Sequence, residues 1–409
     1  MLAISTLITF WMATIGPGPA RPDREARVRD LNDEATRRRA ESPPWQTFRT
    51  FAPEFLRLAA EAPHEPAALA ASLAAAEYGS PCLDTCQYEG TTNGPLMEQV
   101  LGTIASGGRR DDERVGRLCL ALSRLPSPVR EAFLRRMVRE SGDRVVRGRA
   151  SLALAELLKT KLACAESLSR PVTAEIEAKA EQTWGGAYLA HLRSCDRAAL
   201  GTEVESLLDR VVEEFGDVAF ARGTSETPVW RATAEKDLAA GKTLGSVAEA
   251  DLAEIRRLAV GCVAPEIEGR DAEGTSFKLS DHRGKVVVLT FSGNWCGPCR
   301  SMYPYERALV ERLRGRPFAL LSVNTDETLA TLRKSVDAGE ITWRCWWDGS
   351  PGGPIASRWN VRAWPTIYVL DARGVIRAKD APDESLDGLI DGLLAEDAGV
   401  TRVGNDRRE

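Results

Sequence analysis

The feature that most constrains this chain is the motif Trp295-Cys-Gly-Pro-Cys299, which lies between a run of β-branched and aromatic residues, 285–291, and a helical pattern over 296–313. A buried strand that leads into a helix through Cys-x-x-Cys is the usual setting of a redox-active cysteine pair. At the helix N-terminus, unpaired N–H groups and the helix dipole stabilise a thiolate and lower its pKa by about one unit or more from about 8.5. Cys299 follows one turn later and can attack a mixed disulfide on Cys296. The motif therefore predicts Cys296 as the nucleophile and Cys299 as the resolving thiol.

The alternative for such a pair is half of a zinc site, which needs a second Cys or His pair at ligand spacing. The three histidines lie far apart in the sequence, and no such pair is present. We therefore expect no metal and no cofactor. The nine cysteines are an odd number; Cys82 and Cys86 could form a local bridge at an uncommon spacing, and we expect Cys262 and Cys345 to be inert.

A proline points to the same chemistry. In Ala363-Trp-Pro-Thr366, which directly precedes the strand-like run 366–370, the bond to Pro365 is a candidate cis peptide. Such a bond would offer a carbonyl and an N–H beside the disulfide to an extended partner chain; the plainer alternative is a proline at a strand start. Trp295 and Trp364 flank the motifs, and we expect both to contact the partner protein. The other nearby tryptophans are expected to pack in the core or an insert: Trp343, Trp346, Trp347 and Trp359.

The segment around these motifs alternates between strands and helices. Strands are expected at 277–279, 285–291, 318–324, 366–370 and 374–377, and helices at 296–313, 327–338 and 386–394. This order predicts an α/β domain with a mixed central sheet that is covered on both faces.

The first half of the chain has a different periodicity. Apolar residues recur at helical spacing over 45–62, 66–78, 96–105, 114–125, 129–140, 145–168, 172–192, 203–215 and 247–258, without a strict repeat. We expect a charged tether or solvated helix at 21–44, an all-α bundle or helical repeat at 45–260, the α/β domain at 261–396 and a charged tail at 397–409. The last helix, 247–258, either packs against the α/β domain or only completes the helical one.

Residues 1–20 resemble a secretory signal peptide. The apolar run Leu2 to Ile15 is shorter than the roughly 20 residues that span a bilayer, and Gly18-Pro-Ala20 offers a small-x-small cleavage site. Because no Lys or Arg precedes the run, an uncleaved anchor or a cytosolic protein with a misplaced start codon are the alternatives. We expect export to the periplasm, with membrane contact at most through this anchor.

The charge balance argues against nucleic acid as a partner. The 54 Lys and Arg residues nearly balance the 59 Asp and Glu residues, which leaves a formal charge of -5. No large positive field is available to attract a polyanion. We therefore expect no nucleic-acid binding.

The segment with the cysteine motif and Pro365 resembles the thioredoxin superfamily. Within this superfamily it resembles the exported TlpA/ResA-like thiol-disulfide oxidoreductases. The resemblance covers about a third of the chain and includes Phe291-Ser-Gly-Asn-Trp-Cys-Gly-Pro-Cys299 and Trp364-Pro-Thr-Ile-Tyr-Val369. A helical half followed by such a domain resembles an architecture of planctomycete proteins. The resemblance implies a thioredoxin-like fold, protein disulfides as substrates and an upstream thiol as electron donor, and the Gly-Pro dipeptide implies a reductant.

Two positions depart from the family pattern. Thr290 stands where thioredoxin has a buried Asp, and Met302 stands where some members have a Glu. Those acids are thought to manage the proton of the resolving thiol, so water, Glu306 or another group must replace them here. Asp326 is a further candidate, although we expect it to be a solvated loop residue.

Two other functions stay open. A peroxiredoxin-like thiol peroxidase would need Pro-x-x-x-Thr-x-x-Cys, but Thr290 lies six rather than three positions before Cys296. Alternatively, the protein is mainly a helical interaction scaffold with an accessory redox domain. The helical half carries no recognisable catalytic constellation, and it could bind a protein partner.

Overall fold

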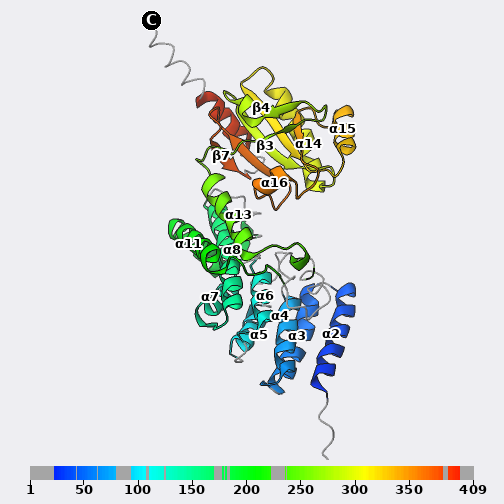
Figure 1. Cartoon of the computed structure of the whole chain (residues 1–409), viewed down its shortest axis with the longest axis vertical. Helices are drawn as coiled ribbons and strands as arrows, with labels where there is room; N and C mark the ends of the chain where they lie inside the picture. Colours follow the sequence, from blue (N-terminus) through cyan, green and yellow to red (C-terminus); the bar gives the residue numbers. More distant parts are fainter. Residues whose placement is uncertain are drawn as a thin grey trace, which may run out of the picture. The chain divides into compact units, whose positions relative to one another are not determined.

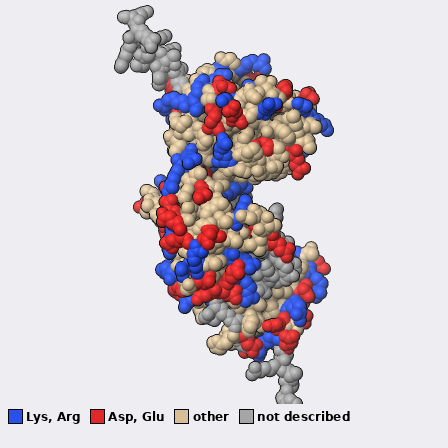
Figure 2. Space-filling model, viewed as in Figure 1, with Lys and Arg blue, Asp and Glu red and all other residues tan. Residues whose placement is uncertain are grey.

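The computed structural model describes residues 23–42, 44–61, 63–79, 94–106, 110–123, 126–169, 177–178, 180–181, 185–222, 235, 237–380 and 386–396. The chain divides into two compact units, Met1–Ala248 and Glu249–Glu409 (Figure 1). Three predicted features lie outside the described residues: the signal peptide at 1–20, the Cys82–Cys86 bridge and the tail at 397–409. On the face shown in Figure 2, basic and acidic side chains are interspersed within each unit.

Most of the described part of the first unit is helical, as the periodicity predicts. Its helices are α2 (Arg24–Glu41), α3 (Pro44–Glu61), α4 (Pro66–Gly79), α5 (Gly94–Ser106), α6 (Glu113–Ala121), α7 (Pro128–Glu140), α8 (Arg144–Leu168), α10 (Gly186–Ser194), α11 (Arg197–Phe215) and the start of α13 (Leu244–Arg257). Aspartates cap several of them; Asp143, for example, accepts a hydrogen bond from Val146 N at 2.8 Å. Helix α8 approaches α11 so closely that a Cβ on Gly148 would lie 2.8 Å from Phe215. Close packing around α8 therefore organises the centre of this unit.

The charged segment predicted as a solvated helix or tether is a helix, and one of its faces is packed rather than solvated. Helix α2 buries Val28 and Ala35 on one face. Arg24 pairs with Glu65 at 3.0 Å, and the Tyr78 hydroxyl of α4 donates to the Asn32 carbonyl at 3.0 Å. Val28, Asn32 and Ala35 are spaced four and three residues apart and so share one helix face, which packs despite the high charge of the segment.

The second unit contains a five-stranded mixed sheet. Its order is β5 (Arg344–Trp347), β4 (Phe318–Asn324), β3 (Val286–Ser292), β6 (Thr366–Leu370) and β7 (Ile376–Lys379). Strands β3, β4 and β5 are parallel, whereas β6 and β7 run antiparallel to their neighbours. A separate antiparallel pair is formed by β1 (Glu268–Arg270) and β2 (Ser276–Lys278). The predicted thioredoxin-like fold with a mixed sheet is confirmed.

Strand β3 is buried on both faces, because helices cover the sheet on each side. Its alternate residues enter two separate cores: Val286 and Val288 pack in one, and Val287 and Leu289 in the other. The first core takes side chains from α14 (Gly297–Arg312), α15 (Leu329–Asp337) and the helix at 386–396. The second takes side chains from η3 (Leu279–His282) and α16 (Pro354–Arg358).

The division between the units falls inside α13, whereas the sequence suggested a boundary near Gly261. The reason is local packing. Leu258 is buried in the second core of the sheet, and Glu254 pairs with Lys379 of β7 at 2.6 Å. The C-terminal part of α13 therefore belongs to the α/β unit.

The topology gathers several loops at one edge of the sheet. Ser292, Asn324 and Trp347 are register partners at the carboxyl ends of the three parallel strands. Strand β6 runs the other way, so it starts at this edge, where Thr366 pairs with Phe291. Functional side chains of α/β proteins collect where such strands end.

Candidate active site

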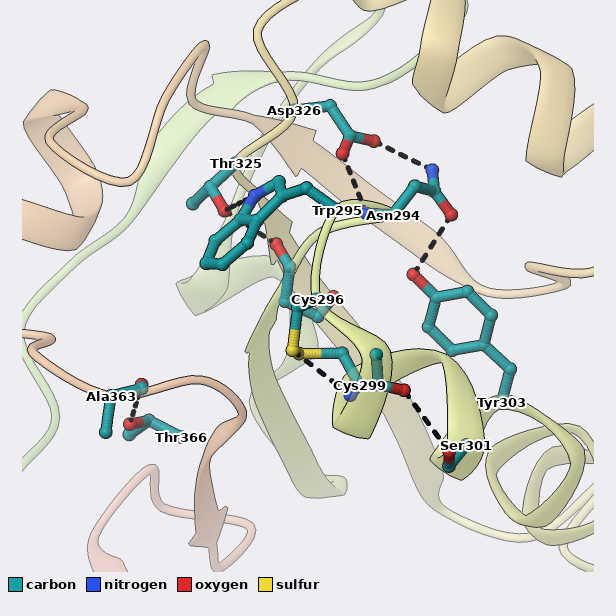
Figure 3. Close-up of a disulfide and its surroundings, with 12 residues drawn as sticks. Asn294, Trp295, Cys296, Cys299, Ser301, Tyr303, Thr325, Asp326, Ala363 and Thr366 are labelled. Atoms are coloured by element: carbon teal, nitrogen blue, oxygen red, sulfur yellow. Dashed lines mark hydrogen bonds between the residues drawn. A yellow bond between two sulfur atoms is a disulfide. The ribbon is translucent and has the colours of Figure 1, made fainter. Parts of the chain in front are cut away.

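The two cysteines of the motif are joined at the start of α14. Cys296 and Cys299 form a disulfide with a Cα–Cα distance of 5.3 Å. Cys296 is the N-cap residue of the helix, and the Cys299 N–H donates to its Sγ at 3.1 Å (Figure 3). An N–H directed at this sulfur would stabilise negative charge on it after reduction. The geometry is therefore that of a helix-capped redox pair.

The loop around Pro365 reaches the cysteine loop. The Trp364–Pro365 peptide bond is cis, as the sequence predicts. The Trp364 ring meets the Trp295 ring edge-to-face, with centroids 5.5 Å apart. Figure 3 draws Ala363 and Thr366, which bracket the cis peptide, on a loop separate from the one that carries the disulfide. Because Trp295 is bonded to Cys296 and Trp364 to Pro365, this ring contact joins the two predicted motifs.

Solvent can reach the two thiols only to a small extent. The exposed fraction is 4% for Cys296 and 1% for Cys299, whereas Trp295 is 52% exposed. A large exposed indole next to a buried disulfide is a surface that another protein can contact.

Asp326 organises the approach to the motif, contrary to the expectation of a solvated loop residue. It is 2% exposed, and its carboxylate accepts hydrogen bonds from Asn294 N (2.7 Å), Asn294 Nδ2 (2.8 Å) and Asn324 Nδ2 (2.9 Å). Asn294 in turn accepts from the Tyr303 hydroxyl at 3.4 Å and the Ser335 hydroxyl at 3.1 Å. The burial of Asp326 was missed because a charged residue after a strand normally faces water.

A second set of bonds orients Trp295. Its indole N–H donates to Thr325 Oγ1 at 3.3 Å, and the same hydroxyl donates to the Ser292 carbonyl at 3.0 Å. Gly293 leaves room for this arrangement, because a Cβ there would lie 2.4 Å from the indole nitrogen. The loops after β3 and β4 thus hold both the cysteine and its neighbouring indole in place.

The position at which thioredoxin has a buried Asp is occupied here by Thr290. This residue is buried on β3, and its hydroxyl has no hydrogen-bond partner among the described residues. Glu306, the replacement suggested by the sequence, is buried on α14. Burial raises the pKa of Tyr303 on the same helix, and the charges of Asp326 and Glu306 act in the same direction. Two carboxylates therefore lie near the redox helix, although neither has the family position.

Three of the four tryptophans that we expect to pack in the core or an insert are buried, and the fourth is partly exposed. Trp343, Trp346 and Trp359 are buried as predicted, but Trp347 is 37% exposed. Its indole N–H donates to the Asp326 carbonyl at 2.8 Å. Trp347 ends β5 at the sheet's edge, where one side of the ring remains in solvent.

The two cysteines that we expect to be inert lie outside the Cys296–Cys299 pair. Burial raises the pKa of the Cys345 thiol to about 12, and Cys262 is half-buried. Among the residues that the structure describes, no three Cys, His, Asp or Glu side chains gather as a metal site would require. In the same part of the chain, no helix combines the length and apolar character needed to cross a bilayer.

Comparison with known proteins places this unit. A family model described as the AhpC/TSA family matches residues 260–379. The thiol-disulfide oxidoreductase ResA of Geobacillus kaustophilus is 31% identical over 120 residues, which are 29% of this chain and 68% of that protein. ResA of Bacillus cereus is 27% identical over 141 residues, 34% of this chain and 80% of that protein. A solved thioredoxin domain of a Bacteroides vulgatus thiol-disulfide oxidoreductase has 26% identity and a TM-score of 0.31, covering 33% of this chain and 98% of that chain.

The fold and the paired cysteines define a thioredoxin-like dithiol-disulfide protein. Since the matched segment is 31% identical to a relative of which it spans 68%, the chain belongs to the ResA family of thiol-disulfide oxidoreductases. The AhpC/TSA match lies within the second unit. The redox chemistry is therefore assigned to residues 249–409.

Proposed function

We propose that this oxidoreductase reduces protein disulfides, with Cys296 as the nucleophile and Cys299 as the resolving thiol. The observation that carries the proposal is the Cys296–Cys299 disulfide at the start of α14, where the Cys299 N–H points at Cys296 Sγ from 3.1 Å. This helix N-terminus favours the thiolate on the sulfur it caps.

The reaction has two exchange steps. In the reduced protein, the Cys296 thiolate attacks one sulfur of the substrate disulfide, and the other substrate sulfur leaves as a thiol. The Cys299 thiolate then attacks Cys296 Sγ, breaks the mixed disulfide and releases the second substrate thiol. Two electrons and two protons pass from the enzyme dithiol to the substrate, and an upstream thiol donor must return them.

Substrate binding is assigned to the cis peptide at Pro365 and to the two indoles beside it. Backbone groups next to a cis proline can pair with an extended chain as an added strand. The edge-to-face contact of Trp295 with Trp364, at 5.5 Å, continues that surface across the cysteine loop. Aromatic side chains that are partly exposed and held in one orientation suit contact with a protein.

A thiol peroxidase is less well supported, although the matching family model is named AhpC/TSA. Thr290 is buried on β3, six positions before Cys296, so it does not occupy the place of the peroxidatic threonine. Both thiols are also nearly buried as a disulfide pair.

We place the protein on the periplasmic side of the membrane, where protein disulfides form and need reduction. The apolar run Leu2 to Ile15 supports export, with an N-terminal anchor as the alternative form. The helical unit is assigned a scaffold role for a protein partner, which is the second function that the sequence left open.

Reduction of insulin disulfides with dithiothreitol as the donor tests the proposal. Wild-type protein should accelerate the reaction, and Cys296→Ser should abolish the acceleration. Cys262→Ser is the matched control, because this half-buried cysteine lies outside the site and its loss should leave turnover unchanged. Equal turnover by wild type and Cys296→Ser would remove Cys296 as the nucleophile, and faster turnover of hydrogen peroxide than of insulin would favour the peroxidase.

A further inference from the structure

The loop that carries cis-Pro365 is held by two acidic side chains of α13. Asp251 accepts a hydrogen bond from the Asn360 side-chain amide at 3.0 Å and pairs with Arg362 at 2.9 Å. Glu254 accepts from the same amide at 2.7 Å. Residues three apart lie on one face of a helix, so α13 presents both carboxylates to one loop.

These contacts involve a buried carboxylate and a constrained backbone. The Asp251 side chain is 1% exposed, and a buried carboxylate is tolerated only when it is paired and hydrogen-bonded. Asn360 has a φ of 48°. This left-handed conformation is uncommon for residues other than glycine, although asparagine adopts it more often than most. Its amide is also bound from within the loop, since Arg362 Nε donates to Asn360 Oδ1 at 3.2 Å.

Glu254 also forms an ion pair with the sheet. Its other carboxylate oxygen lies 2.6 Å from Lys379 Nζ on β7. The residue that directly follows α13, Leu258, is buried in the second core of the sheet and anchors this end of the helix. The carboxylates are therefore held to the sheet and hold the loop in turn.

The position of this loop determines the position of the proposed binding surface. Arg362 precedes Trp364 by two residues, and Trp364 rests against Trp295. The Thr366 hydroxyl donates to the Ala363 carbonyl at 2.8 Å, which ties the far end of the loop to the start of β6. With Asn360 and Thr366 both anchored, little freedom is left for the backbone at Pro365.

We propose that Asp251 and Glu254 are positioning residues: they hold loop 360–364 so that the backbone at cis-Pro365 and the Trp364 ring can receive an extended polypeptide disulfide. The proposal rests on the proposed function, because it takes this loop as the substrate-binding element. It assigns a catalytic consequence to a helix that precedes the family-matched segment and begins at Leu244.

Two single full-length variants, their double variant and one control test it. Asp251→Asn removes the ion pair with Arg362, and Asn360→Gly removes the amide while keeping a residue that adopts positive φ readily. Glu249→Gln is the control, because it makes the same type of change at an exposed position of the same helix. Each is assayed with insulin and with the small disulfide 5,5′-dithiobis(2-nitrobenzoate), which does not need to pair with a backbone.

We expect KM for insulin to rise about threefold to tenfold in Asp251→Asn and Asn360→Gly, with kcat for the small disulfide unchanged. The rise in KM in the double variant Asp251→Asn/Asn360→Gly should be smaller than the product of the two single effects, since both changes loosen the same loop. Hydrogen exchange of peptide 359–366 should be faster in both variants than in wild type and Glu249→Gln.

The proposal fails if wild type reduces insulin and Asn360→Gly has the same KM, or if insulin and the small disulfide are affected equally. Unchanged exchange in peptide 359–366 would also overturn it. Asn360→Gly keeps the test decisive should Asp251→Asn not fold. A wild-type protein that reduces the small disulfide but not insulin would instead contradict the proposed function.

Discussion

Asp326 accepts two hydrogen bonds from Asn294, one from the backbone N–H at 2.7 Å and one from the side-chain amide at 2.8 Å. Asn294 is two residues before Cys296, so this bidentate contact fixes the loop that delivers the nucleophile to the start of α14. A carboxylate after β4 thereby positions a cysteine after β3, at the edge where the parallel strands end.

Replacing Asp326 by alanine should destabilise the α/β unit and disturb this loop. The change leaves Asn294 N, Asn294 Nδ2 and Asn324 Nδ2 without their acceptor, which costs about 1 to 3 kcal/mol of the free energy of unfolding. Urea denaturation of the oxidised protein measures this loss. The exposed Asp337, at the end of α15, is the control, and equal midpoints for Asp326→Ala and Asp337→Ala would show that the network contributes nothing.

Replacing Cys299 by serine should leave the first attack intact and block the second. The serine hydroxyl cannot displace a thiol from Cys296, so mixed disulfides with substrates should accumulate. Mass spectrometry after pulldown of Cys299→Ser, with the Cys296→Ser/Cys299→Ser protein as control, detects the adducts. Absence of Cys296-linked proteins from folded Cys299→Ser would contradict the assigned roles.

Stability should fall as the pH drops below about 6.5, the ordinary pKa of His282, in part because of this residue. Burial lowers the pKa of His282, and the Lys285 charge acts in the same direction. Below about 6.5 the unfolded chain therefore binds a proton that the folded chain does not, which favours unfolding.

His282→Phe removes that titration and keeps the edge-to-face contact with Phe277 possible. Neither ring nitrogen of His282 has a hydrogen-bond partner among the described residues, so the change to phenylalanine removes no hydrogen bond there. The melting temperature of the variant should decline less between pH 7.5 and 5.5 than that of wild type. Parallel curves for the two proteins would assign the pH dependence to other groups.

A protein that starts at Gly261 should melt at a lower temperature than one that starts at Thr243. The shorter chain lacks Leu258, which is buried in the core of the sheet, and the Glu254–Lys379 ion pair. Burying a leucine contributes about 1.5 to 3 kcal/mol. Equal melting temperatures, measured with the disulfide oxidised in both, would show that this end of α13 is dispensable for the α/β unit.

Local sequence determined the parts of this protein that depend on nearest neighbours. The run Phe318 to Asn324 and the run Thr366 to Leu370 predict β4 and β6 to the residue, because short, mostly apolar runs of this length favour buried strands. The cysteine pair at a helix start carries its chemistry in the spacing itself. The bond to Pro365 is a candidate cis peptide because the proline precedes a strand in a chain that also carries this cysteine pair, and the bond is cis in the structure.

Tertiary structure decided the roles of charged and amphipathic residues. Asp326, Asp251 and Trp347 have no local pattern that separates a structural contact from a solvated side chain. Asp326 and Asp251 each have a partner from a distant part of the chain, Asn294 at 32 residues and Asn360 at 109 residues. Segment 24–41 is packed for the same reason, since its three buried residues find α3 and α4 only after folding. The free energy of a charged side chain depends on what surrounds it, and long-range packing alone sets those surroundings.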